Sequence, residues 1–523
     1  MLRTRWLGRV RYRDGHALQR ALFDNAADDY LLLTEHPHVY TLGLRASLDN
    51  VLVAPESVGA ELVSTNRGGD VTYHGPGQLV GYPILSMPDA PGATPAYVHS
   101  VEQLVIDTCA DLGFQGAGRI DGYPGVWVDV EGRSPRKLCA IGVRRTRGRT
   151  MHGFALNVDP DLTYFDHIIP CGIRDKGVTS LAAEEVHVTM AQVVDALAAR
   201  AAARWGGGLT ERQDVSVRRS NAAEKSVAAV LAVAEAVPFG SPKPAWLRVK
   251  ADLGPGFREI KRTMRAQSLV TVCEEAGCPN IFECWNAGTA TFMINGERCT
   301  RACGFCLVDT ERPAAPDPAE AEHVAEAVER MNLAHAVITG VARDDLPDGG
   351  AAAFAAAIQA VRGRCPSTTI EVLIPDCKGN PEALHAIFSA GPDVLNHNLE
   401  TVARLQRAVR PQASYARSLA VLGRARDAKL VTKSGLMVGM GESQAEVLGA
   451  MADLRNVGVE ILTLGQYLRP TAEHLPVARW WDPAEFEVLR SAGEAMGFSH
   501  VQSSPLTRSS YHAREAAAVT VGG

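Results

Sequence analysis

The sequence has no long hydrophobic run and no excess of positive charge. Its longest purely apolar stretch, Val227 to Ala234, is far shorter than the roughly 18 residues that suggest a membrane-spanning helix. The net charge is −6 at pH 7, whereas a general nucleic-acid binder presents a basic face that displaces counterions from phosphates. We therefore expect a protein that binds neither membranes nor nucleic acid.

The N-terminus also lacks a targeting signal. Its first residues are rich in arginine, but no apolar signal core follows them. The alternation around Trp6, Val10 and Tyr12 is more typical of the first strand of a domain. Together with the many cysteines described below, which suit a reducing compartment, this pattern predicts a cytoplasmic protein.

The 523 residues are enough for more than one domain. Residues 1–212 alternate short β-rich runs with helical stretches and predict an α/β domain. Residues 213–241 turn polar, then alanine-rich, then rich in proline, glycine and serine, and predict a linker with a short helix at Ala222 to Ala236. Residues 242–523 repeat a short apolar strand and an amphipathic helix, which indicates parallel strands with crossover helices. If these strands form a barrel, we expect the active site at their carboxyl ends.

The cysteines are clustered. Six of the eleven lie between Cys273 and Cys306, which is typical of metal binding and not of a disulfide framework. Cys299, Cys303 and Cys306 have C-x₃-C-x₂-C spacing on one short segment. Three thiolates can hold three irons of a 4Fe–4S cube and leave the fourth iron open to chelate S-adenosyl-L-methionine. This spacing resembles the radical SAM superfamily; the alternative, a zinc knuckle, would need four ligands in a closed site.

A second set of three thiols lies just upstream. Cys273, Cys278 and Cys284 have C-x₄-C-x₅-C spacing, again one ligand short of a full set. With this segment, the following motifs make residues 242–515 closely similar to the lipoyl synthase family: GVARDDLPDGG at 340–350, NHNLETV at 396–402, TKSGLMVGMGE at 432–442, LGQYLRPT at 464–471 and RSSYHA at 508–513.

The resemblance implies a partial (β/α) TIM-like barrel with two 4Fe–4S clusters. In this family the second set of cysteines holds an auxiliary cluster that supplies two sulfurs, and its fourth ligand is a serine of the RSSY motif, here Ser510. Polar residues at the expected strand ends are candidates to clamp S-adenosyl-L-methionine, although ordinary barrel-mouth positions are the alternative: Thr339, Asn398, Glu400, Lys433 and Gln466. Cys365 and Cys377 are more typical of core thiols.

The first domain carries a glycine-rich segment, Arg67 to Gln78, which by itself is a weak signal. Four further motifs make residues 5–210 similar to the lipoyl/octanoyl transferase family, which has the biotin and lipoate ligase fold: GVWV at 125–128, KLCAIG at 137–142, HGFALN at 152–157 and IPCG at 169–172.

This resemblance implies that Cys171 is the nucleophile and that Lys137 holds a positive charge beside it. An enzyme thioester is the simplest route from a carrier thioester to a lysine amine, because thiolate exchange is nearly isoenergetic. Cys139 is a rival, since a regular strand would point residues 137 and 139 to one face. The expected acyl-pocket residues are Arg67, Gly68, Gly69, Asp70, Val71, Thr72, Tyr73, His74, Ala140, Ile141, Gly142, Gly153, Phe154 and Ala155.

The sequence thus predicts a fused enzyme of lipoate synthesis. The first half would transfer octanoyl from octanoyl-acyl carrier protein to a lysine of a lipoyl domain, and the second would insert sulfur at C6 and C8. The implied acceptors are the lipoyl domains of 2-oxoacid dehydrogenases and the glycine cleavage H protein, with ferredoxin or flavodoxin as reductant. Two alternatives stay open for the first half: it could be an ATP-dependent lipoate ligase, or a docking module for lipoyl domains that has no catalytic activity.

Overall fold

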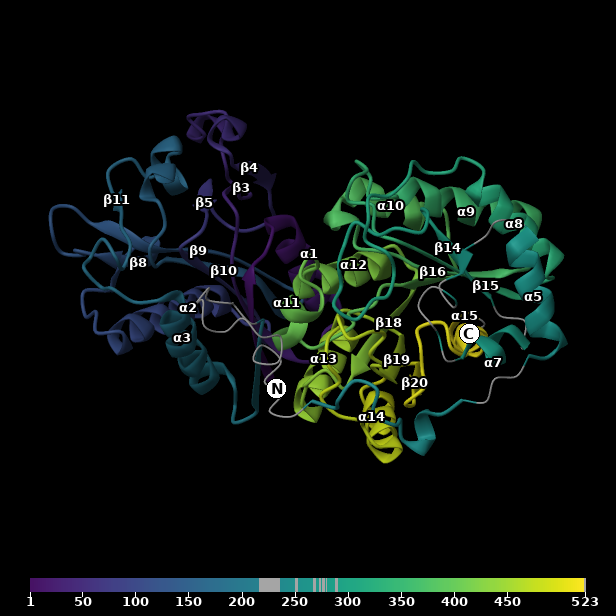
Figure 1. Cartoon of the computed structure of the whole chain (residues 1–523). Helices are drawn as coiled ribbons and strands as arrows, with labels where there is room; N and C mark the ends of the chain where they lie inside the picture. The colour runs from purple at the N-terminus through teal and green to yellow at the C-terminus, as the bar shows by residue number, and fades with distance from the viewer. Residues whose placement is uncertain are drawn as a thin grey trace. The chain divides into compact units, whose positions relative to one another are not determined.

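The computed structural model describes residues 1–215, 236–249, 253–266, 270–271, 274, 278, 280–286 and 290–521 (Figure 1). The chain divides into two compact units, Met1–Val217 and Arg218–Gly523. Most of the predicted linker helix lies outside the described residues. At the edges of the predicted linker, Gln213 and Asp214 extend the last strand of the first unit, and Val237 pairs with Val477 in the second.

The first unit is built on a nine-stranded mixed sheet in the order β12-β1-β2-β6-β10-β9-β8-β7, with β11 paired to β9. Its strands are β1 (Leu2–Arg9), β2 (Asp29–Glu35), β6 (Gln78–Ile84), β7 (Gly118–Ile120), β8 (Tyr123–Val128), β9 (Arg136–Thr146), β10 (Arg149–Asn157), β11 (Gly177–Val178) and β12 (Thr210–Asp214). A three-stranded sheet, in the order β4-β3-β5, contains β3 (Val39–Leu42), β4 (Glu61–Ser64) and β5 (Thr72–His74).

Helices cover this sheet. The long helices α2 (Ala93–Asp111) and α3 (Met190–Trp205) bury their apolar sides with the sheet in one core. A capping box at Thr189 and Gln192 starts α3 by satisfying two of its first amide groups. Helix α1 (Tyr12–Asn25) contacts β6 and β10 and brings Tyr12 toward the interior. The predicted α/β class of this unit is confirmed.

The second unit contains an eight-stranded sheet whose strand order follows the sequence. Strand β13 (Val270–Thr271) is antiparallel to its neighbour, and the others are parallel: β14 (Ala290–Ile294), β15 (His335–Gly340), β16 (Thr369–Leu373), β17 (Val394–Asn396), β18 (Val431–Val438), β19 (Ile461–Gln466) and β20 (His500–Ser503). Within the described strands β13 and β20 are the two edges, so the sheet forms an open, partial barrel. The carboxyl ends of the parallel strands share one edge, as predicted.

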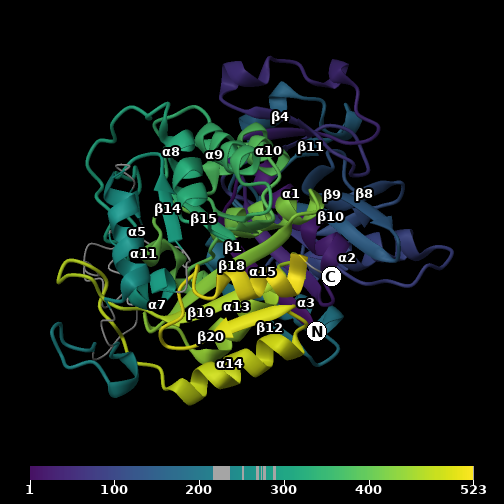
Figure 2. The same cartoon turned by 90° about the vertical axis from the view of Figure 1, so that its right-hand side faces the viewer.

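Helices connect successive strands of this unit, as the alternation predicts, and two more, α5 (Pro255–Ala266) and α15 (Ala513–Val521), lie before the first strand and after the last. The connecting helices are α7 (Ile281–Asn286), α8 (Glu320–Arg330), α9 (Ala351–Arg364), α10 (Pro381–Ser389), α11 (Gln406–Val409), α12 (Tyr415–Asp427), α13 (Gln444–Asn456) and α14 (Pro483–Ala495). Helices α14 and α15 both lie beside β20 (Figure 2). In α15, Ala516 and Ala517 pack on Val394 and Ile461, the first residues of β17 and β19. No helix in the described ranges is long and apolar enough to cross a membrane.

A buried ion pair lies inside this barrel. The Lys433 ammonium on β18 is 2.9 and 3.0 Å from the two carboxylate oxygens of Glu371 on β16, and both side chains are almost fully buried. His335 Nε2 lies 3.7 Å from the same carboxylate. Burial opposes ionisation of Glu371, but the nearby Lys433 outweighs it and lowers the pKa of Glu371 to about 2.

We predict that Glu371→Gln destabilises the second unit by about 3–5 kcal/mol, because it leaves a buried ammonium without its counter-charge. The stabilisation by the pair is present at neutral pH. It declines as the pH falls from about 4.5, the ordinary pKa, through about 2, the folded-state pKa. Urea denaturation followed by hydrogen exchange of peptides from β16 and β18 measures this unit alone.

The matched control is Glu487→Gln, which breaks the exposed pair of Glu487 with Arg490 and should lower the stability far less, because solvent screens an exposed pair. Replacing both partners with apolar residues, Glu371→Leu with Lys433→Met, should cost less than Glu371→Gln alone. Equal losses for the buried and the exposed variant would contradict the role of this pair.

Candidate active sites

The turn that carries Cys171 holds the thiol in a constrained position. Pro170–Gly172 form a 3₁₀ turn in which Cys171 has φ 56° and ψ 17°, a left-handed conformation that is uncommon for residues other than glycine. The Cys171 amide donates to the Val71 carbonyl at 3.0 Å, which ties the turn to the glycine-rich segment. The thiol thereby faces a cavity of the first unit.

Lys137 lies beside this thiol. Its Nζ is 3.6 Å from Cys171 Sγ and 4.6 Å from the ring centroid of Trp127, and the side chain is buried. A buried ammonium group therefore lies within hydrogen-bonding distance of the sulfur. The structure therefore brings together the two residues that the sequence predicts to be catalytic.

Cys139 does not share this site, and the expectation that it faces the same side as Lys137 is wrong. The pairing of β8 with β9 shifts there: Val126 pairs with Cys139, but Trp127 pairs with Lys137. Leu138 is therefore an extra residue, a β-bulge that re-aims the chain. Both Leu138 and Cys139 lie in the hydrophobic core, where burial raises the pKa of the Cys139 thiol far above its ordinary value.

A cavity of about 40 Å³ opens beside Cys171. The predicted pocket residues that line it are Arg67, Gly68, Gly69, Thr72, His74, Ala140, Ile141, Gly142, Gly153, Phe154 and Ala155. Glycine is needed where backbones approach closely. A Cβ on Gly142 would lie 3.0 Å from the Gly68 carbonyl oxygen, and one on Gly153 would lie 2.2 Å from that of Gly81.

Three predicted pocket residues do not line this cavity. Asp70 accepts a hydrogen bond from Asn50 Nδ2 at 2.6 Å, Val71 is fully buried, and the Tyr73 hydroxyl lies 2.8 Å from His38 Nδ1. Asp70, Val71 and Tyr73 instead hold the glycine-rich segment in place through these contacts. Lys137 also lies outside the lining, where its Nζ contacts Cys171 Sγ.

The cavity also contains residues that the sequence analysis missed: Tyr12, Val80, Tyr82 and His152. His152 opens a motif that carries the family resemblance, so that motif could have identified it. Tyr12 comes from α1 and Tyr82 from β6, and no local pattern in those segments marks a site.

The electrostatics of this cavity suit an anion. The buried Arg67 guanidinium donates to the Thr41 carbonyl at 2.5 Å and interacts electrostatically with Cys171. Burial lowers the pKa of His74 to about 3, so its imidazole is neutral at pH 7. Because the Gln78 amide nitrogen donates elsewhere, His74 Nδ1 donates to Gln78 Oε1 at 2.8 Å. Arg67 therefore brings a positive charge to the lining of this cavity, whereas His74 does not.

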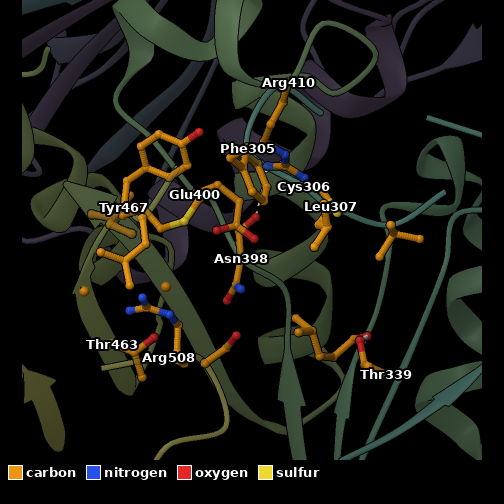
Figure 3. A pocket seen from close by; sticks show the side chains of 18 of the residues that line it. Phe305, Cys306, Leu307, Thr339, Asn398, Glu400, Arg410, Thr463, Tyr467 and Arg508 are labelled. Carbon is orange, nitrogen blue, oxygen red and sulfur yellow. Dashed lines mark hydrogen bonds between the residues drawn. The ribbon is translucent and has the colours of Figure 1, made fainter. Parts of the chain in front are cut away.

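The second unit has a cavity of about 660 Å³ at the carboxyl ends of its parallel strands (Figure 3). Cys299 and Cys306, on the loop after β14, line one part of it, and Arg508 and Ser509, after β20, line another. Predicted clamp residues complete the lining: Thr339, Asn398, Glu400 and Gln466. One cavity thus adjoins both segments that the sequence predicts to hold clusters.

The three thiols of the first set are neighbours in the structure. Cys306 interacts electrostatically with both Cys299 and Cys303, and burial raises the pKa of Cys303 and, to about 12, that of Cys306. In the described part of the chain, no three His, Cys, Asp or Glu side chains converge on a single ion. An iron–sulfur cube takes each thiolate on a different iron, and three neighbouring cysteines of one loop fit that ligand set.

A network of buried charges fixes this cysteine loop. Arg301, between Cys299 and Cys303, donates to both carboxylate oxygens of Asp344 at 2.8 and 2.9 Å and to Asp376 at 2.6 Å. Burial opposes ionisation of Asp376, but Arg301 keeps its pKa below the ordinary value. The loop is therefore tied to the segments that follow β15 and β16.

The second set of thiols lies against the RSSY segment. Cys284 interacts electrostatically with Cys278, and burial raises the pKa of Cys284 to about 12. Two contacts join this segment to the one around Ser510: Asn280 Nδ2 donates to the Leu506 carbonyl at 2.7 Å, and the Tyr511 hydroxyl donates to Glu283 at 3.1 Å. The predicted ligand Cys273 lies outside the described residues.

Asn398 is the clamp residue most open to a ligand. Its buried Oδ1 has no hydrogen-bond partner in the described structure, and a Cβ on Gly435 would lie 2.9 Å from that oxygen. Glu400, two residues along, is half-buried; desolvation raises its pKa, while Arg410 opposes the rise. An acceptor oxygen, a carboxyl group and a guanidinium thus face the cavity together, and these groups fit a zwitterionic ligand such as S-adenosyl-L-methionine.

Two predicted clamp residues have other partners. Gln466 lines the cavity, but its amide donates to the carbonyls of Tyr467 and Arg479 and accepts from the Trp481 amide. Lys433 does not reach the cavity at all. It is the third residue of β18, near the amino end of the strand, and its ammonium is paired with Glu371.

The sequence analysis missed other lining residues, including Arg410, Thr463 and Tyr467 (Figure 3). Arg410 donates to the carbonyls of Asn398 and Leu399 at 3.0 and 3.1 Å, so it shapes the loop after β17. No pattern marks Arg410, whereas Tyr467 stands inside a motif that carries the resemblance.

Comparison with known proteins agrees with this division of the chain. Residues 11–202 match the lipoyl protein ligase A/B catalytic domain, and residues 293–454 match the radical SAM superfamily. The chain is 58% identical over 275 residues to a lipoyl synthase of Rubrobacter xylanophilus, a match that covers 52% of this chain and 86% of that protein. It is 56% identical over 283 residues to a lipoyl synthase of Symbiobacterium thermophilum, covering 54% and 88%.

Among solved structures, a bipartite lipoate protein ligase of Thermoplasma acidophilum aligns with 42% of this chain and 88% of its own, at 16% identity and a TM-score of 0.34. The sequence matches are the stronger finding. Over its second half the chain belongs to the lipoyl synthase family of the radical SAM superfamily, and its first half is a lipoyl protein ligase A/B catalytic domain joined to it.

Proposed function

We propose that this chain carries out two successive steps of lipoate assembly. Residues 1–212 would transfer octanoyl from octanoyl-acyl carrier protein to a lipoyl-domain lysine, and residues 242–523 would convert the attached octanoyl group to lipoyl. The observation that carries the first step is the 3.6 Å approach of Lys137 Nζ to Cys171 Sγ at the cavity edge. A ligase that activates its acid as an adenylate needs no such thiol.

The transfer would run through Cys171. Its thiolate attacks the carbonyl carbon of the octanoyl thioester, and the carrier sulfur leaves as a thiolate while the Cys171 thioester forms. The neutral acceptor lysine amine then attacks that thioester, the amide bond forms, Cys171 leaves as a thiolate, and the proton that the amine loses balances the carrier thiolate. Lys137 stabilises the thiolate at both stages, and the buried cation of Arg67 favours negative charge in the cavity.

The second step would use the large cavity. As a radical SAM lipoyl synthase, this half uses S-adenosyl-L-methionine and iron–sulfur chemistry. We propose two 4Fe–4S clusters, one held by Cys299, Cys303 and Cys306 and one by Cys273, Cys278, Cys284 and Ser510. When bound, the first would supply the electron that cleaves S-adenosyl-L-methionine, and the second the sulfur atoms.

The residues of this chain orient the reactants. The unpartnered Asn398 Oδ1 would accept a hydrogen bond from S-adenosyl-L-methionine, and Thr339 and Glu400 would complete that side. The octanoyl chain would lie between the cysteine loop and the RSSY segment, because the cavity reaches both. Lipoyl domains of 2-oxoacid dehydrogenases and the glycine cleavage H protein are the proposed acceptors, with ferredoxin or flavodoxin as electron donor.

We predict that Cys171→Ala abolishes octanoyl transfer but leaves sulfur insertion into an acceptor that is already octanoylated. Lys137→Met should slow transfer by about 100-fold or more, the scale of losing one charge-stabilising group. It should also slow alkylation of Cys171 by iodoacetamide at neutral pH. Mass spectrometry of the acceptor and of the alkylated peptide measures both effects.

Cys139→Ala is the matched control, because this thiol lies two residues from Lys137 but in the core. It should retain transfer. Loss of transfer in Cys139→Ala with retention in Cys171→Ala would contradict the assignment of the nucleophile. Dependence of wild-type transfer on ATP would instead indicate a ligase.

The two proposed clusters can be separated by substitution. Cys303→Ala should retain about four of about eight irons, the stoichiometry of two cubes, and should stop cleavage of S-adenosyl-L-methionine. Cys278→Ala should also lose about half the iron but still release 5′-deoxyadenosine without forming lipoyl product. Iron analysis and chromatography of 5′-deoxyadenosine measure these outcomes.

Cys365→Ala is the control, because this thiol follows α9, outside both sets. It should keep full iron content and activity. If 5′-deoxyadenosine forms in Cys303→Ala, or lipoyl product in Cys278→Ala, the roles of the two sets are reversed or wrong.

A further inference from the structure

Three exposed leucines stand close together in the sequence of the first unit. Leu44, Leu48 and Leu52 are 71%, 66% and 55% exposed, and they occupy one short segment between β3 and β4. Single exposed apolar residues are ordinary on a protein surface, but three large ones on one short segment make that segment a candidate contact surface. We refer to these three residues as the leucine rim.

The segment that carries the rim is firmly attached to the transferase site. On one side, the Leu44 amide donates to the Arg67 carbonyl at 3.0 Å and the Arg45 amide to that of Gly69 at 3.1 Å. These bonds join the segment to the glycine-rich part of the pocket. The leucines are therefore exposed from an anchored backbone and not from a loose loop.

The other side of the segment is attached to the loop of the nucleophile. The Ile169 amide donates to the Asn50 carbonyl at 2.8 Å, and the Leu52 amide donates to that of His167 at 2.8 Å. Asn50 Nδ2 also donates to Asp70 at 2.6 Å. The rim segment thus bridges the two loops that form the cavity around Cys171.

Two arginines in these loops carry charges with no internal partner. Arg45 follows Leu44, and Arg174 comes three residues after Cys171; both are exposed. Within the described part of the chain, neither forms an ion pair with a carboxylate. A guanidinium fork matches a phosphate in two parallel hydrogen bonds, so unpaired arginines at a site favour a phosphate ligand.

We propose that the leucine rim, with Arg45 and Arg174, is the docking surface for the acyl carrier protein that delivers the octanoyl thioester. This inference rests on the proposed transferase function and names the surface that its donor uses. Such a donor carries the thioester on an arm joined to the protein through a phosphodiester. The leucines contact apolar residues of the carrier, and the arginines meet the phosphodiester and the acidic surface around it.

The charges favour this donor over the lipoyl-domain acceptor. Both are proteins that must reach Cys171, but the acceptor presents a lysine side chain and carries no phosphate. Arg45 and Arg174 would bring that ammonium next to like charges. A surface that combines unpaired arginines with exposed leucines complements the carrier and its phosphate arm better.

The test compares two thioester donors with the full chain. Replacing the rim, Leu44→Ser with Leu48→Ser and Leu52→Ser, should raise the KM for octanoyl-carrier protein by about tenfold or more, since several buried contacts are lost. The KM and kcat for octanoyl-pantetheine, which has neither protein nor phosphate, should stay within about twofold. Arg45→Gln should raise only the carrier KM and weaken its dependence on salt.

Leu209→Ser is the matched control, because Leu209 is 63% exposed but precedes β12 at the far edge of the sheet. It should change neither KM. If the triple variant loses activity with octanoyl-pantetheine, the single variant Leu48→Ser decides between the roles. Equal losses with both donors in that variant would mean that the rim shapes the pocket, which overturns the proposal.

Other outcomes also decide the matter. A rise in the KM for the lipoyl domain, with the carrier KM unchanged, would assign the rim to the acceptor and overturn the proposal. An unchanged KM for every protein substrate would do the same. Failure of the wild-type chain to form an acyl-enzyme with any octanoyl thioester would instead contradict the transferase function itself.

Discussion

The geometry of the second site depends on the buried guanidinium of Arg301. The cysteine loop has no regular secondary structure of its own, yet its thiols must be held at fixed separations. Arg301 ties the loop to Asp344 and Asp376, which follow two neighbouring strands of the barrel. Because a guanidinium makes planar, directional bonds, this contact fixes the orientation of the loop as well as its position. The rigid sheet thereby determines where the irregular loop presents its sulfur atoms.

In the first site, backbone contacts hold the loop that carries the cysteine. Cys171 adopts a left-handed conformation, and its amide is bonded to the glycine-rich segment, which the rim segment in turn supports. Close approach of chains adds to the buried charge of Arg67 here, and the glycines at positions 142 and 153 make that approach possible. In both sites, a short irregular loop carries the reactive sulfur, and contacts distant in sequence hold it.

The sequence predicted the fold well because both units follow simple periodic patterns. Strands β16, β18 and β19 lie in residues 242–523, where the sequence repeats a short strand and a helix. The prediction that was wrong depended on where a strand begins and ends. Lys433 was expected at a strand end, but β18 begins at Val431, so this lysine lies deep in the barrel. Arg410 and Tyr12 were missed because only the folded chain brings them to their cavities, and no local pattern marks them.

The bulge at Leu138 has a wider consequence for how this enzyme can change. In a regular strand, side chains two residues apart lie on the same face, so Lys137 and Cys139 would share one face. The extra residue interrupts that alternation between Lys137 and the core residues that follow it. The core side chains near Cys139 therefore lie on the face of the strand opposite the Lys137 ammonium, and selection can act on the two faces separately. A deletion of one residue at this point would remove that independence, so we expect the strand's length here to be under stronger selection than the identity of Leu138.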